Sequence, residues 1–158
     1  MNAQDVLKYG QGTLLQTIDG FPESTWDTQG ACGIWSVKDI IAHLASYEAV
    51  LVDILSGFVA KRPTPYLDKY TGLGGRFNDL EVESRRTKTA REVLSELHDA
   101  HTQAMELAGQ IRPELFRQAG TLPWYGMEYS LDDVLVYMYY GHKREHSAQI
   151  AAFRDHLD

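Results

Sequence analysis

Hydrophobic residues recur at helical spacing in four segments of the chain, and no segment alternates as a strand would. The predicted helices span about residues 4–20, 36–61, 78–111 and 130 to the C-terminus. Ser36 with Asp39, and Ser130 with Asp133, resemble capping pairs at the start of the second and fourth helices. Prolines follow the second helix and end it. The pattern therefore predicts an all-α fold.

The connection between the second and third helices is long enough to fix their relative direction. It reads "RPTPYLDKYTGLGGRF" and is rich in Pro, Gly and polar residues. A helix of ~25 residues spans ~37 Å, whereas an extended connection of about 16 residues reaches ~50 Å. The chain can therefore return along the bundle, which makes these two helices parallel. The stretch "RPELFRQAGTLPWYGMEY" joins the third and fourth helices, and its composition does not indicate which way the chain runs there.

Composition restricts the classes of partner. The 158 residues fit a single domain, residues 1–158, that can bury a core without disulfides. Acidic residues number 22 against 15 basic ones, for a net charge of -7, and no basic stripe is present, so we expect no nucleic-acid partner. Neither a signal sequence nor an apolar run long enough to cross a membrane is apparent. Together with the single cysteine, Cys32, this favours a cytoplasmic protein.

Histidines interrupt the apolar face of the fourth predicted helix. His142 and His146 stand four residues apart, on one face, where leucines would be expected. His43 lies on the inward stripe of the second helix. If these helices are antiparallel, His43 lies ~10 Å from the start of its helix and His146 ~18 Å from the end of its own. The three imidazoles can then meet at a similar depth.

Such a trio has a definite chemistry. Three neutral imidazoles suit Zn, Ni, Fe or Cu, with Zn and Ni favoured here, and three protein ligands leave a position for water or substrate. An ion of this kind lowers the pKa of bound water or of a bound thiol, which favours a catalytic site. The alternative is a set of hydrogen-bonded core histidines without metal.

Further residues are candidates for the surroundings of this site. Glu48 and Glu145 can act as a general base or support a ligand, or they can simply face solvent. An apolar pocket can have aromatic walls, although core packing explains each aromatic residue equally well. The residues concerned are Trp35, Tyr47, Trp124, Tyr125, Tyr137 and Tyr140.

Other polar residues are assigned to solvent or to structure. His98 and His101 stand in a polar setting and are expected on a solvated helix face. Lys143 and Arg144, between the paired histidines, are expected on the solvent-exposed face of their helix. Cys32 has no histidine nearby in the sequence that would make it a nucleophile.

The segments "WSVKDIIAHLASYE" and "GHKREHSAQI" resemble the two signature helices of the DinB/YfiT-like superfamily of metal-dependent enzymes. The segment "RFNDLEVESRRTKTAREVLSELHDAH" is similar to the family's third helix, with Asn78 and Arg85 at matching positions. The resemblance implies a four-helix bundle, up-down-down-up, with a long crossover between helices 2 and 3. It also implies a three-histidine metal site at His43, His142 and His146.

The resemblance further implies several activities. Members of the family include thiol-dependent isomerases and transferases, and a related ClbS/DfsB-like branch includes a cyclopropane hydrolase. We therefore expect a metal-dependent hydrolase or thiol S-transferase that acts on a small molecule, with a low-molecular-weight thiol as an optional cosubstrate. The alternatives are a protein that binds or sequesters a small molecule without turnover, and an interaction module. Family analogy also leaves a homodimer open.

Overall fold

Helices account for the regular structure of residues 2–157, which a computed structural model of the protein describes, apart from an isolated β-bridge between Cys32 and Trp35. The α-helices are α1 (Ala3–Ile18), α2 (Val37–Ser56), α3 (Pro65–Leu73), α4 (Phe77–Ser84), α5 (Ala90–Ala108), α6 (Leu131–Val134) and α7 (Gly141–Asp155). A π-helical segment, Leu135–Tyr140, joins α6 to α7. Short 3-10 turns lie at Glu23–Thr25, Gly74–Arg76 and Pro113–Arg117. The prediction of an all-α fold is confirmed.

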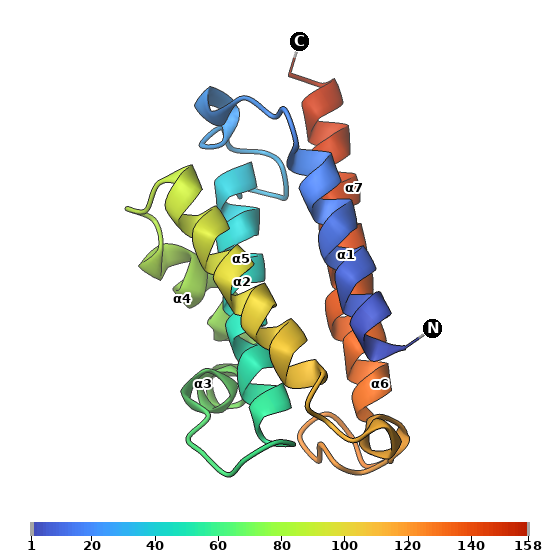
Figure 1. Ribbon diagram of the computed structural model, residues 1–158. Coiled ribbons are helices and arrows are strands. Elements are labelled where there is room, and N and C mark those ends of the chain that lie inside the picture. The colour runs from blue at the N-terminus through green and yellow to red at the C-terminus, as the bar shows by residue number, and fades with distance from the viewer. Residues whose placement is uncertain (1, 158) are drawn as a thin grey trace.

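Two pairs of long helices build the body of the molecule (Figure 1). α2 packs along α5, and α1 packs along α7 and the π-helical segment. In the view of Figure 1, α1 runs upward, α2 and α5 both run downward, and α7 runs upward again to the C-terminus. The shorter helices α3 and α4 pack against α2, on the left in this view.

α2 lies at the centre of the core. Its N-terminal half packs with Leu14 and Val93 in one buried cluster, and its C-terminal half packs with Leu131 and Leu135 in a second. Most residues of α2 are buried, including polar ones. Polar side chains on this helix therefore have to find partners inside the protein, because an unpaired buried polar group costs free energy.

The start of α2 agrees with the sequence signal. The Ser36 hydroxyl accepts a hydrogen bond from the Asp39 backbone N–H, and the Asp39 carboxylate accepts one from the Ser36 N–H. This reciprocal pair satisfies donors that the first helical turn leaves free. Ser130 and Asp133 cap α6 in the same way. Both predicted caps are confirmed, although α2 ends at Ser56, short of the predicted end near Lys61.

The crossover is more structured than the sequence pattern predicted. The connection expected to be irregular contains α3, which starts at Pro65, a residue whose fixed φ suits the first helical position. The predicted helix 78–111 is two helices, α4 and α5, separated at residues 85–89. Thr89 explains the break, because its hydroxyl accepts a hydrogen bond from the Glu92 N–H and so starts a new helix.

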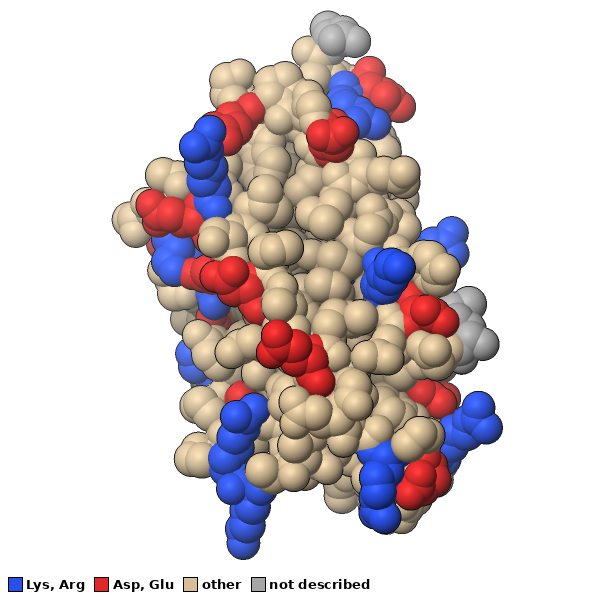
Figure 2. Space-filling model, viewed as in Figure 1, with Lys and Arg blue, Asp and Glu red and all other residues tan. Residues whose placement is uncertain are grey.

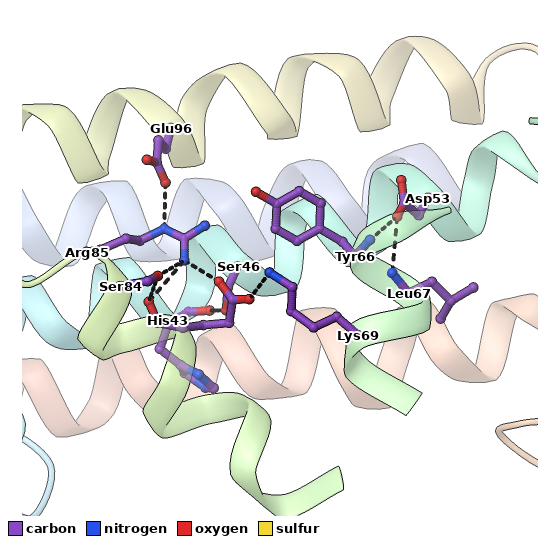
Figure 3. A network of polar contacts seen from close by, with 10 residues as sticks. His43, Ser46, Asp53, Tyr66, Leu67, Lys69, Ser84, Arg85 and Glu96 are labelled. Atoms are coloured by element: carbon purple, nitrogen blue, oxygen red, sulfur yellow. Dashed lines mark hydrogen bonds and ion pairs between the residues drawn. The ribbon is translucent and has the colours of Figure 1, made fainter. Parts of the chain in front are cut away.

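Polar contacts fasten the crossover to the main helices (Figure 3). The Asp53 carboxylate on α2 accepts hydrogen bonds from the backbone N–H groups of Tyr66, at 2.7 Å, and Leu67, at 3.1 Å, in the first turn of α3. Lys69 on α3 is paired with Glu81 on α4 at 2.8 Å. Each short helix is thus held at a fixed place along α2.

Arg85 extends this network to α5. Its buried guanidinium donates to Glu81 at 2.6 Å and to Glu96 on α5 at 2.7 Å (Figure 3). Arg85, which matches a family-like position in the sequence, therefore joins the end of α4 to α5. Its role in the structure is to hold the crossover.

Charges of both signs are interspersed on the face of the molecule that Figure 2 shows. Among residues 2–157, none of the helices combines the length and the apolarity that crossing a bilayer requires.

Candidate metal centre

Three imidazoles from two helices converge inside the bundle. His142 Nε2 lies 3.0 Å from His43 Nε2 and 3.0 Å from His146 Nε2. The possible ligand atoms of all three residues lie within 4.8 Å of one another. A tetrahedral ion with Zn–N bonds of ~2.0–2.1 Å separates its nitrogens by roughly 3.3 Å. The donor set therefore fits a divalent ion such as Zn.

The π-helical segment sets the start of α7. The Gly141 N–H donates to the Val136 carbonyl oxygen, five residues back, and a Cβ at Gly141 would lie only 3.3 Å from that oxygen. The Tyr139 hydroxyl, within the segment, donates to the Tyr47 carbonyl oxygen on α2 at 2.9 Å. The segment therefore ties α7 to α2 directly before His142. Such π segments occur often at functional sites.

Burial keeps the three imidazoles neutral. Burial first, and then the neighbouring His142 and His146, lower the pKa of His43 to about 2. The pKa of His142 falls to about 4, from burial first and then from His146 and Lys143. Burial also lowers the pKa of His146. Neutral imidazoles present a lone pair, which is the form that a metal ion binds.

Gln149 orients one of the ligands. Its side-chain oxygen lies 2.7 Å from His146 Nδ1, so this nitrogen carries the proton and Nε2 is left with its lone pair toward the other histidines. The sequence-based reasoning missed Gln149, although it follows His146 by three residues and so lies on the same helix face. His43 Nδ1 is buried without a hydrogen-bond partner among residues 2–157.

Two of the six aromatic residues considered for the pocket, Trp35 and Tyr47, touch the histidines. The Trp35 ring centre lies 5.0 Å from that of His43. The Tyr47 ring lies 4.7 Å from His43 and 4.8 Å from His142. Trp124 lines a cavity together with Tyr47. Tyr137 is 68 % exposed and points away from the core.

Glu48 belongs to a buried ion pair. It is fully buried and is bonded to the Lys143 ammonium, which also donates to Gln11 Oε1 at 2.8 Å. Burial alone would raise the pKa of Glu48, but Lys143 and His101 outweigh it and the pKa ends below its usual value. A carboxylate held in this way is a poor general base at neutral pH. Glu145, the other candidate base, is exposed on α7.

Two assignments to solvent are wrong. Lys143 is 3 % exposed and faces the core, where its ammonium group donates hydrogen bonds to Glu48 and Gln11 from two other helices. His101 is largely buried, with Nδ1 3.7 Å from Glu48 Oε2. His98, on the same helix, is exposed as expected. Neither inward position shows in a short sequence window, since the partners come from distant helices.

The comparisons with known proteins agree with this arrangement. A sequence model described as the DinB superfamily matches residues 7–150, a span that includes all three histidines. No curated protein and no solved structure matches the chain. Because the family match covers most of the chain, the protein belongs to the DinB superfamily.

Proposed function

We propose that the protein is a metal-dependent enzyme that acts on a small molecule. In this proposal His43, His142 and His146 hold a divalent ion. Zn and Ni are the preferred ions, and Fe is the next candidate. The observation that supports this proposal is the cluster of three neutral, largely buried imidazoles whose possible ligand atoms lie close together. A bound ion supplies Lewis acidity, which activates water or a low-molecular-weight thiol at neutral pH.

The chain's own residues have separate tasks in this proposal. Gln149 holds the proton on His146 Nδ1, so that the opposite nitrogen stays free to bind. Tyr47 and Trp35 pack on the histidine rings and limit the access of water. Glu48 is left out of the chemistry, since Lys143 neutralises it. Hydrolase and thiol S-transferase reactions both use such a site.

The proposal includes the setting of the site. We assign the DinB-type topology, a single up-down-down-up four-helix bundle with a long crossover, on the pairing of α2 with α5 and of α1 with α7. We place the protein in the cytoplasm, where a lone Cys32 suits reducing conditions.

Metal content tests the proposal directly. Protein purified without a histidine tag should contain about one divalent ion per chain, and His142→Ala should lose it, because two imidazoles hold such an ion far more weakly than three. His98→Ala is the matched control, since His98 is an exposed histidine outside the cluster. A metal-free wild-type protein whose activity is unaffected by His142→Ala would contradict the proposal.

A second function, sequestration of a small molecule without turnover, is favoured by the aromatic cavity beside Tyr47. Incubation with a panel of electrophiles, each with water alone, glutathione, mycothiol or bacillithiol, separates the two. Product formed in excess of protein supports the enzyme. Retention of one unmodified molecule per chain supports the binding protein.

A further inference from the structure

A cavity of about 530 Å³ lies beside the histidine cluster, between α2, α3, α4 and the loop that precedes α6. This volume falls in the range of small-molecule sites, about 300–1,000 Å³. The side chains that line it include Tyr47, Tyr70, Thr71, Asn78, Trp124 and Tyr125. Of these residues, only Tyr47, Trp124 and Tyr125 were considered for a pocket from the sequence.

Tyr47 is a wall common to the cavity and the metal centre. Its ring lines the cavity and also packs on His43 and His142, with ring centres 4.7 and 4.8 Å apart. A molecule that fills the cavity therefore lies about one aromatic ring away from the candidate ligands. The cavity and the candidate metal centre are therefore direct neighbours, with the Tyr47 ring between them.

The aromatic walls form a continuous series. Tyr47 packs on Tyr70 with ring centres 5.6 Å apart, Tyr70 on Trp124 at 5.9 Å, and Trp124 on Tyr125 at 5.8 Å. The interplanar angles of 75°, 82° and 70° are those of edge-to-face packing. Together these rings give the cavity a largely aromatic lining, which suits an apolar, unsaturated ligand.

The polar groups of the lining carry no charge. Thr71, Asn78 and the tyrosine hydroxyls can exchange hydrogen bonds with a ligand, and no Asp, Glu, Lys or Arg is among the lining residues. The Trp124 indole N–H is buried and has no hydrogen-bond partner among residues 2–157. The hydroxyl and amide groups of the lining are the donors that an acceptor atom on a ligand would meet.

Polar contacts hold α3 and α4, the two short helices that carry part of the lining, in place against α2 and each other (Figure 3). Asp53 fixes the first turn of α3, and the pairing of Lys69 with Glu81 joins α3, which carries Tyr70, to α4, which carries Asn78. The same pairing occupies Lys69, so its charge is already balanced. A cavity with fixed walls loses little entropy on binding.

We infer that this cavity binds the body of the substrate, and that the substrate is a neutral, flat aromatic or unsaturated molecule with a hydrogen-bond acceptor. The inference rests on the proposed function, because it takes the adjoining histidines to be the reactive centre. An anion would lose its hydration without gaining a cationic partner in the lining. A thiol that carries carboxylates, such as glutathione, would have to approach the metal centre from outside the cavity.

Three probes with the same ring system test the ligand class. Calorimetric titration of the metal-free protein, in which no ion can coordinate the carboxylate, should give affinity for 2-naphthylmethanol at least about tenfold above that for 2-naphthoate or 2-naphthylmethylammonium. Equal or tighter binding of the anion would overturn the inference. Tightest binding of the cation would overturn it as well, and would indicate an aromatic cage for cations.

Variants locate the binding. Tyr70→Ala and Trp124→Phe, each checked for native helix content, should lower the affinity for 2-naphthylmethanol. Tyr70→Ala should lower it by about tenfold or more, because one aromatic wall of the cavity is lost. Tyr137→Ala is the control, since this exposed tyrosine is absent from the lining. Undiminished binding by both Tyr70→Ala and Trp124→Phe would overturn the assignment of the cavity.

Proximity to the metal is measured separately. With Cu²⁺ in the protein, the proton relaxation of bound 2-naphthylmethanol should be much faster than with Zn²⁺, because paramagnetic relaxation acts only at short range. Binding without this enhancement would overturn the role of the cavity as the substrate site and leave the metal proposal intact. If no metal binds, the proposed function fails, whereas the affinities of the three probes for the metal-free protein still decide the ligand class.

Discussion

His146 depends on a single neighbour for the orientation of its ring. Gln149 Oε1 accepts a hydrogen bond from the His146 Nδ1–H group at 2.7 Å, and the opposite nitrogen faces His142. Partners of this kind orient a metal ligand and make it more basic. Gln149 therefore belongs to the centre although it does not touch the metal position.

Gln149→Leu should weaken metal binding by about 10- to 100-fold, because the imidazole of His146 loses the acceptor that fixes its proton. Competition with a chromophoric chelator measures the affinity for Zn²⁺. Gln103→Leu is the control, since Gln103 is an exposed glutamine on α5. The same affinity in the Gln149 variant and the wild type would show that this hydrogen bond is irrelevant to the site.

The buried histidines should make the metal-free protein less stable as the pH falls. The pKa of His43 is about 2 and that of His142 about 4 in the folded protein, below the usual 6.5. As the pH falls from 6.5 toward 4, the unfolded chain binds protons that the folded chain does not. The contribution of these imidazoles to the free energy of unfolding should therefore be complete above pH 6.5. Below that pH the free energy of unfolding should fall by up to about 1.4 kcal/mol per pH unit for each imidazole.

Urea denaturation of the metal-free protein between about pH 7 and pH 5 measures this slope. His43→Asn should reduce the slope by the part that one titrating imidazole contributes, because asparagine does not titrate. His98→Asn should leave the slope unchanged, since His98 is exposed. A slope unaffected by His43→Asn would mean that the folded protein protonates this imidazole as readily as the unfolded chain does.

At the level of the helices, a buried ion pair joins α7 to the rest of the bundle. Lys143 lies between the two histidines of α7 and is bonded to Glu48 on α2 and Gln11 on α1. Both charged residues are nearly or fully buried. Such a pair is weak as a source of stability, but the loss of one partner leaves an uncompensated charge in the core.

Lys143→Met should therefore lower the free energy of unfolding by about 3–5 kcal/mol. The double variant Glu48→Met with Lys143→Met should recover most of that loss, since no unpaired charge remains. Urea denaturation of the four proteins in the cycle gives the coupling between the two residues. Additive losses in the double variant would contradict a direct pairing.

The helices also show where local sequence signals succeed. The capping pairs at Ser36 and Ser130 predicted the starts of α2 and α6, because a cap depends only on residues three apart. Thr89 carries a similar signal with Glu92, but Val82 and Val93 stand about three helical turns apart, which favours one unbroken helix across the break. Arg85, which lies at the break, turns inward and joins the two helices through Glu81 and Glu96.

At the scale of the molecule, the centre joins two helices that otherwise have few contacts. α7 packs mainly on α1, while α2 packs mainly on α5, and the histidines bridge the two pairs. An ion bound there would act as a cross-link present only in the folded protein. Metal binding should therefore stabilise the whole fold.

Zn²⁺ at about 100 times its dissociation constant should raise the free energy of unfolding by about 2.7 kcal/mol. Urea denaturation with Zn²⁺ and with a chelator measures the difference. His142→Ala should abolish it, and His98→Ala should retain it. An equal rise in the His142 variant would point to metal bound elsewhere on the protein.

The all-α fold, two of the caps and the three-histidine proposal could be reached from the sequence, because periodicity, capping and the i, i+4 spacing are local properties of the chain. Only the tertiary structure decided that Lys143 faces inward, since its partner Glu48 is 95 residues away. The same holds for the cavity, whose walls come from α2, α3, α4 and a distant loop. Local spacing determines which residues can share a helix face, whereas packing between distant helices determines which face is buried and what it meets.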